Sequence, residues 1–273
     1  MSSTNDRLKS LTTDGRTELL FEQVRAVSRW ALPPDDVRLV RLPRVYRPAA
    51  DSMLLAKSVT AAIDRSDTPA EALELCAGTG YVSLLAARMG AIVTAIDVDR
   101  RSVATIRLNA RLNRLPVTAR RADLRTMQTT RRYDLVFANP PYVPTESATR
   151  NSDTGLAWNA GPDGRELLDP ICHRAHRLVR PGGTLIIVQS DLSKPEITCR
   201  QLRADGFAVT IQESIDVPFG PVLSGRLPYL VEAGLIPPGE RTERVSAIVA
   251  TAPAAQDNSG SSDDCPAVQE LNT

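Results

Sequence analysis

A short apolar strand that runs into a glycine turn constrains the fold of this chain most strongly. The strand from Ala72 to Leu75 leads into a turn that contains Gly78 and Gly80. A helical pattern follows, with apolar or small residues at Val82, Leu85, Ala86 and Met89. Glycines let the backbone approach a ligand closely at the N-terminus of a helix. The pattern therefore predicts a nucleotide-type loop between a buried strand and a helix.

The loop lacks one feature of a dinucleotide site. Ser83 stands where a dinucleotide-binding fingerprint has its third glycine, which argues against a pyrophosphate ligand. S-adenosylmethionine has no phosphate and needs only the close approach of the backbone. The loop therefore favours a ligand of that kind.

Two carboxylates follow in an order that suits such a ligand. Asp97 ends a second predicted strand, from Ala91 to Ile96. A carboxylate at that position can accept both hydroxyls of a ribose. After a helix that buries Val103, Ile106 and Ala110, a strand at 117–119 leads to Asp123. Asp123 is placed in chain order to accept the amino group of adenine.

The tetrapeptide Asn139-Pro140-Pro141-Tyr142 ends another apolar run, at 133–138. The lone pair of an amide or exocyclic amine is delocalised, so a site must hold this nitrogen rather than deprotonate it. The Asn139 oxygen and the Pro140 carbonyl can each accept one N–H, while the Tyr142 ring packs on the flat group. The two prolines stiffen the turn. The tetrapeptide also fits an ordinary turn after a strand.

Together these motifs resemble the class I S-adenosylmethionine-dependent methyltransferases, and more narrowly the HemK-type protein-glutamine methyltransferases. The resemblance extends from about Tyr46 to Thr251. It includes the segments Tyr46–Ser52, Glu74–Gly80, with Cys76 where many members have glycine, and Ala157–Glu166. It implies an α/β fold with a seven-stranded Rossmann-like sheet and helices on both faces.

The resemblance also implies roles for individual residues. The catalytic residues would be Asn139, Pro140 and Tyr142. The residues implied to bind S-adenosylmethionine are Asp51, Glu74, Cys76, Gly78, Gly80, Asp97, Asp123 and Asn139.

The resemblance is closest to the short branch of this family, which methylates the Gly-Gly-Gln loop of eukaryotic and archaeal release factors. A longer bacterial branch carries a helical release-factor-binding domain ahead of the catalytic one. A protein substrate such as a release factor is therefore expected, and a small zinc-binding activator subunit is compatible with this family.

Three regions are expected along the chain. Residues 1–50 form an N-terminal extension with a helical stretch near Glu18 to Trp30 and a short strand around Val37 to Leu42. This extension could be a lid, a docking element or a packing extension that covers a sheet edge. Residues 51–251 form the catalytic domain. Residues 252–273 are rich in Ser, Asp, Ala and Pro without Lys or Arg, which predicts a disordered acidic tail.

The second half of the catalytic domain is expected to contain two helices, Arg165 to Leu178 and Glu196 to Ala204. Its strands are expected at Thr184 to Val188, after Pro181-Gly182-Gly183, and at Ala208 to Ile215 with Arg244 to Thr251. The low-apolar stretch from Val143 to Pro162 suits a loop over the acceptor, where Glu146 and Trp158 could shape the substrate channel.

Composition agrees with one sizeable domain, because the chain has 273 residues of which 42% are hydrophobic. No apolar run is long enough for a membrane span, and the polar start does not resemble a signal peptide, so a cytoplasmic protein is expected. The cysteines lack Cys-x-x-Cys spacing, and His173 and His176 have no further ligand nearby, so no metal site is predicted.

Several functions stay open at this point. An exocyclic amine of adenine or guanine poses the same chemical problem, so a nucleic-acid methyltransferase is an alternative. The ten arginines between Arg100 and Arg132 could meet RNA or an acidic protein, or could simply form a solvated helix face. A non-catalytic cofactor-binding subunit and a small-molecule N-methyltransferase are further alternatives.

Overall fold

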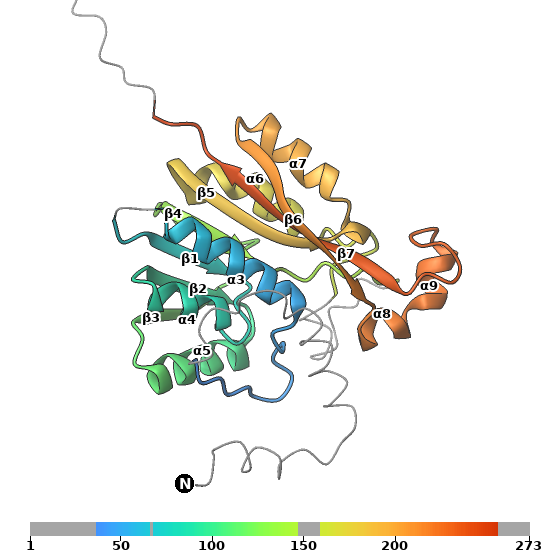
Figure 1. Cartoon of the computed structure of the whole chain (residues 1–273), viewed down its shortest axis with the longest axis horizontal. Coiled ribbons are helices and arrows are strands. Elements are labelled where there is room, and N and C mark those ends of the chain that lie inside the picture. The colour runs from blue at the N-terminus through green and yellow to red at the C-terminus, as the bar shows by residue number, and fades with distance from the viewer. Residues whose placement is uncertain (1–36, 66–67, 147–158, 256–273) are drawn as a thin grey trace, which may run out of the picture.

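The computed structural model describes residues 37–65, 68–146 and 159–255 of the chain. Their centre is a seven-stranded sheet with the strand order β3-β2-β1-β4-β5-β7-β6 (Figure 1). The strands are β1 (Glu71–Leu75), β2 (Ile92–Asp97), β3 (Val117–Arg121), β4 (Tyr133–Ala138), β5 (Val179–Ser190), β6 (Ala208–Pro218) and β7 (Thr242–Thr251). β1 to β5 pair in parallel, whereas β7 runs antiparallel to β5 and β6. The predicted Rossmann-like sheet is confirmed.

Helices cover both faces of the sheet (Figure 1). One face carries α3 (Ala50–Ile63), α4 (Tyr81–Arg88) and α5 (Arg100–Asn113). The other face carries α6 (Leu168–Leu178) and α7 (Pro195–Ala204). The short helices η2 (Asp191–Ser193), α8 (Pro221–Gly225) and α9 (Leu227–Glu232) complete the described part. In Figure 1, α8 and α9 lie beyond the ends of β6 and β7.

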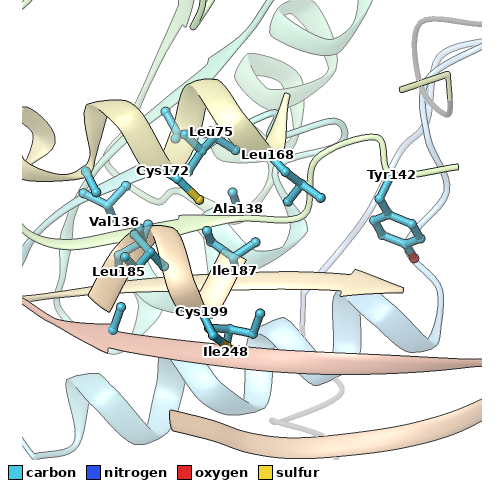
Figure 2. Close-up of a cluster of buried hydrophobic side chains, with 14 of the residues drawn as sticks. Leu75, Val136, Ala138, Tyr142, Leu168, Cys172, Leu185, Ile187, Cys199 and Ile248 are labelled. Carbon is cyan, nitrogen blue, oxygen red and sulfur yellow. The ribbon is translucent and has the colours of Figure 1, made fainter. Parts of the chain in front are cut away.

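The strands are apolar on both sides because each side packs against helices. In β1, Ala72 faces the cluster beneath α3 and α4, whereas Leu73 and Leu75 face the cluster beneath α6 and α7. Figure 2 shows this second cluster, whose labelled members include Leu75, Val136, Leu168, Cys172, Ile187 and Ile248. The helices follow the same logic, since the buried positions of α6 recur at intervals of three and four residues.

The sheet order brings the two predicted motifs together. β1 and β4 are neighbours, and their last residues pair as Leu75 with Ala138. The glycine loop follows β1 and Asn139 follows β4, so both lie at the carboxyl edge of the sheet. This is the position at which the strand order reverses, where open α/β sheets bind their ligands.

The predicted strand from Val37 to Leu42 is wrong, because this segment is extended but pairs with no strand. Side chains of α5 satisfy its backbone instead. The Oδ1 atoms of Asn113 and Asn109 accept from Arg38 N and Val40 N, each at 2.8 Å. Their Nδ2 groups donate back to the carbonyls of Arg38 and Val40. The segment therefore covers α5 rather than a sheet edge. The helical stretch predicted near Glu18 to Trp30 lies outside the described residues.

Other boundaries shift by a few residues. α6 begins at Leu168 rather than Arg165, because the preceding residues form a turn. β5 begins at Val179, so Pro181-Gly182-Gly183 lies within the strand. Ala252 is buried and donates its N–H to Gly183 O, so ordered packing passes the predicted boundary at 252. The structure adds α8 and α9, which the sequence analysis did not predict.

Candidate functional site

The loop between β1 and α4 has the conformation that its glycines predict. Gly78 and Gly80 have φ values of 55° and 76°, and Cys76 adopts the same left-handed region with φ 56°. A Cβ atom at Gly80 would lie only 3.0 Å from Ile106 Cγ2 of α5, and the positive φ would strain any other residue, so both features favour glycine there. The left-handed turn leads the backbone directly into the N-terminus of α4, with Gly80 as its N-cap residue.

Asp97 faces this loop from the end of β2. Its Oδ2 accepts the Gly78 N–H at 2.9 Å and its Oδ1 accepts the Asp99 N–H at 2.9 Å. Burial raises the pKa of Asp97, while these two backbone hydrogen bonds lower it. Each carboxylate oxygen has two lone pairs, so the group keeps capacity for further donors. The structure thus brings Gly78, Gly80 and Asp97 together as predicted.

Glu74, which is predicted to bind the cofactor, is buried in β1. Its side chain is only 4% exposed, beneath the glycine loop. Its Oε2 accepts the Ser83 N–H at 2.9 Å and also bonds the Ser83 hydroxyl. Burial raises the pKa of Glu74 to about 8, although the Ser83 bonds lower it. Because Glu74 ties the first turn of α4 to β1, it supports the loop. Its contact with the cofactor stays a prediction.

Asp123 is ion-paired in the structure. Arg125 binds it through Nε at 2.9 Å and through a second guanidinium nitrogen at 2.5 Å, and also reaches Glu166 at 3.1 Å. These hydrogen bonds raise the pKa of Arg125. Asp123, the predicted partner of adenine, is therefore already bound by Arg125, which links it to Glu166.

Asp51 is the hub of the part of the site around the Asn139 turn, because several side chains donate hydrogen bonds to its carboxylate. It lies in the first turn of α3 and is 7% exposed. Its Oδ2 accepts from Tyr46 Oη at 2.7 Å, Asn139 Nδ2 at 2.9 Å and Tyr142 Oη at 3.0 Å. Its Oδ1 accepts from Ser52 N and Oγ. One carboxylate thus connects the Tyr46 segment to the tetrapeptide after β4.

The hub fixes the orientation of Asn139. Because Asn139 Nδ2 donates to Asp51, its Oδ1 is the atom left to accept. No described residue donates to that oxygen. Tyr142 lies apart from the other side chains in Figure 2, and its hydroxyl reaches Asp51. Burial, with the nearby Asp51 and Glu243 charges, raises the pKa of Tyr142 well above its ordinary value, so the ring stays neutral.

Two residues of this region escaped the sequence analysis. Arg226 precedes α9 and donates to the carbonyls of Val143, at 3.4 Å, and Pro144, at 3.0 Å, and to Asn159 Oδ1. It therefore holds both ends of the loop that follows Tyr142. No sequence pattern indicates this role of Arg226.

Glu243, the second residue, lies on β7 in phase with the buried Val245 and Ala247, and this alternation could have revealed its burial.

The remaining predictions about the site have mixed outcomes. Glu146 is exposed, and Trp158 lies outside the described ranges. His173 and His176 are exposed on α6, and the described residues contain no group of three or more His, Cys, Asp or Glu that could hold a metal ion. Arg107, Arg111 and Arg114 are exposed, as predicted. Among the described helices, none is long and apolar enough to cross a membrane.

Comparison with known proteins decides the family. The methyltransferase small domain profile matches residues 49–204, which include the glycine loop, Asp97 and the Asn139 turn. The chain belongs to this family. It is a methyltransferase that uses S-adenosylmethionine, and the residues of the glycine loop fit that cofactor, because Gly78 and Gly80 leave the backbone open beside the Asp97 carboxylate.

Individual relatives of this methyltransferase carry more specific names. A Methanocaldococcus jannaschii protein assigned as a protein N5-glutamine methyltransferase is 33% identical over 187 residues, covering 68% of this chain and 92% of that protein. The mouse methyltransferase HEMK2 is 32% identical, covering 61% of this chain and 81% of its own. The predicted HemK-type resemblance is confirmed.

A solved structure agrees with the fold. The Encephalitozoon (E. cuniculi) Mtq2–Trm112 complex, described as methylating the eRF1 translation termination factor, matches with a TM-score of 0.52. The identity is 20%, and the match covers 77% of this chain and 99% of the other. At this identity the likeness shows the fold alone.

Proposed function

We propose that this methyltransferase modifies the side-chain amide nitrogen of a glutamine in a protein, and that a translation release factor is that protein. The observation that carries the proposal is the fixed orientation of Asn139. Asp51 holds its Nδ2 at 2.9 Å, so its Oδ1 is presented as an acceptor. An acceptor at this position suits an N–H of a planar amide. The names of the relatives support the same acceptor chemistry.

The Asn139 turn would work by orientation. Asn139 Oδ1 and the Pro140 carbonyl each accept one N–H of the acceptor amide, and the Tyr142 ring packs against its plane. These bonds draw the nitrogen lone pair out of conjugation and aim it at the methyl donor. The bound cofactor supplies an electrophilic methyl group on its sulfonium. The nitrogen exchanges one proton for the methyl group and the proton passes to water, so no titrating base is needed.

The glycine loop, together with Asp97 and Asp123, would hold the cofactor. Gly78 and Gly80 allow the backbone to approach it, with Cys76 at the start of the loop, and Asp97 accepts the ribose hydroxyls. Asp123 receives the adenine amino group and shares its carboxylate with Arg125. Asp51 lies between the two halves, and its position supports a part in both cofactor binding and acceptor alignment.

A protein substrate also suggests where the enzyme acts and with what partner. Release factors act on ribosomes, so we place the activity in the cytoplasm. By analogy with the Mtq2–Trm112 complex, a small activator subunit is the expected partner. Residues 1–50 are a candidate docking element, and the described part of them, from residue 37, packs on α5 through Asn109 and Asn113.

The proposal is tested by methyl transfer from radiolabelled S-adenosylmethionine into lysate of the source organism lacking this gene. Parallel digestions with protease and nuclease then identify the acceptor. Label released by protease, and mapped to glutamine by mass spectrometry, is the expected result. Label released only by nuclease contradicts the protein acceptor.

One observation favours a second candidate, an amino methyltransferase acting on adenine or guanine in RNA. Arg107, Arg111 and Arg114 are exposed along α5, where they could meet a phosphate backbone. The nuclease arm of the same experiment tests this candidate. Incorporation into neither fraction, with measurable cofactor binding, would instead indicate a non-catalytic cofactor-binding subunit, because the lysate supplies any activator.

A further inference from the structure

Glu243 is a buried carboxyl group that the proposed mechanism does not use. It lies on β7, paired with Val217 of β6, and is 8% exposed. Its Oε2 is buried and has no hydrogen-bond partner. A buried polar atom without a partner is destabilising, and more so when it is charged. Such an atom at the edge of a site indicates that a ligand supplies the missing donor.

Glu243 lies on the same face of β7 as Val245 and Ala247, which pack in one cluster with α3, and α3 carries Asp51 in its first turn. Burial raises the pKa of Glu243 to about 7, the Ser190 hydroxyl lowers it by hydrogen bonding, and the Asp51 and Asp191 charges raise it. Burial is the main cause of the raised pKa values of Tyr46 and Tyr142, the two tyrosines that bind Asp51, and the Asp51 and Glu243 charges raise these pKa values further.

The carboxylates of Asp51 and Glu243 differ in how many hydrogen bonds they accept. Asp51 receives donors on both oxygens, from Ser52, Tyr46, Asn139 and Tyr142. The Oε2 atom of Glu243 is buried and accepts no hydrogen bond. The next residue, Arg244, cannot supply the donor, because successive strand residues point to opposite faces and its guanidinium binds Asp216 at 2.8 Å. The donor must therefore come from elsewhere.

The sheet order indicates which ligand approaches this oxygen. Gly78 and Asp97 follow β1 and β2, on one side of β4, whereas Glu243 lies on β7, beyond β5 on the other side. Asn139 follows β4 between them. Glu243 is therefore on the side of Asn139 that faces away from the cofactor loop.

We propose that Glu243 binds the acceptor substrate, with its open carboxylate oxygen accepting an N–H from the acceptor beside the nitrogen that is methylated. This inference rests on the proposed function. Since Asn139 and Pro140 take both N–H groups of the glutamine amide, the donor to Glu243 is a main-chain N–H of the segment that carries the glutamine. Glu243 then selects an acceptor segment whose backbone is exposed next to the modified side chain.

The test compares Glu243→Gln with wild type, using protein from the gene-deleted lysate as the acceptor at increasing concentration. Glutamine keeps the shape and removes the charge, so the substrate concentration at half-maximal rate should rise about 10-fold, the difference between a charged and a neutral hydrogen bond. The affinity for S-adenosylmethionine, measured by calorimetry, should change less than about 2-fold. Asp216→Asn, an exposed carboxyl on β6, is the matched control and should change neither value.

A pH profile separates this role from a structural one. The groups facing Glu243 are Asp51, Asp191, Tyr46 and Tyr142, and the two tyrosines stay protonated because their pKa values are raised. As Glu243 ionises near pH 7, it becomes a better acceptor, so wild-type kcat/KM should rise between pH 6 and pH 8. The Glu243→Gln variant should lose this rise.

The outcomes distinguish the two proposals. Protein labelling with an unchanged half-maximal concentration, or an equal loss of cofactor affinity, would overturn the role of Glu243 and leave the proposed function standing. Labelling of nucleic acid alone would overturn the proposed function, and the same comparison would then be made with that acceptor. Labelling of neither fraction would overturn both.

Discussion

The two halves of the active site are built from the chain in opposite ways. In the cofactor half, from β1 to β2, hydrogen-bonded partners are close in sequence: 9 residues separate Ser83 from Glu74 and 19 separate Gly78 from Asp97. In the acceptor half, Asn139 and Tyr142 bind Asp51 across 88 and 91 residues. Local sequence therefore determines the glycine loop that is proposed to hold the cofactor, whereas tertiary packing orients the Asn139 turn that is proposed to align the acceptor.

This contrast predicts that substitutions in the acceptor half change turnover and leave cofactor affinity intact. Asn139→Ala removes an acceptor oriented by Asp51 and should lower kcat by about 10²- to 10³-fold. The change in S-adenosylmethionine affinity should stay below about 2-fold by calorimetry. Asn113→Ala, on α5, is the control and should keep normal turnover. A collapse of cofactor affinity in Asn139→Ala would show that Asn139 is structural.

The pH dependence of stability tests the cofactor half. A carboxyl with a raised pKa stabilises the fold while protonated, so this contribution is present below its unfolded pKa and is lost as pH rises through its folded pKa. For Glu74 that window runs from about 4.5 to about 8. Wild type should therefore lose on the order of 3 kcal/mol relative to Glu74→Gln between pH 5 and pH 9.

Urea unfolding at both pH values measures this difference, and groups that titrate in both proteins cancel. Glu166→Gln, a half-buried carboxyl outside the α4 turn, is a suitable control. A difference between wild type and Glu74→Gln that does not vary with pH would contradict the buried position of Glu74.

Asp97→Ala should show the reverse of the Asn139 pattern. It removes the carboxylate proposed to accept the ribose hydroxyls and should weaken S-adenosylmethionine binding by about 10- to 100-fold. Turnover at saturating cofactor should change much less. Asp99→Ala is the matched control, because Asp99 caps α5 through the Arg101 N–H and its loss costs helix stability alone. Unchanged affinity in Asp97→Ala would remove Asp97 from the site.

The smallest expected effect concerns the loop after the tetrapeptide. Arg226→Ala breaks the bonds to Val143, Pro144 and Asn159, so the acceptor loop loses one anchor. The KM for the acceptor should rise about 10-fold, without a change in cofactor affinity. Arg241→Ala, an exposed arginine in the same β6–β7 connection, should leave both values unchanged. Equal effects of the two substitutions would show a general destabilisation.

The same contrast explains what sequence could predict. The strand, glycine turn and following helix of the cofactor half are adjacent in the chain, so their pattern predicts their structure. The bonds from Ser83 to Glu74 were not predicted, because they depend on how α4 packs on β1. The 37–42 segment was misread because asparagines on α5, about 70 residues away, satisfy its backbone. Arg226 and Glu243 reach the site only through the antiparallel β6 and β7. The alternation along β7 indicates that Glu243 is buried, but local pattern does not indicate which residues it faces.

The position of β7 also affects the order in which the protein can form. The last strand of the domain pairs with β5 and β6 rather than at an edge, from Thr184 with Thr251 to Pro218 with Thr242. During synthesis, β1, β2 and β4 and the glycine loop exist before these residues are made. A nascent chain could therefore form the glycine loop and its neighbouring strands before β7, which carries Glu243, has been made. Truncation before residue 242 removes β7, an interior strand, so the sheet is complete only once the last strand of the domain has been made.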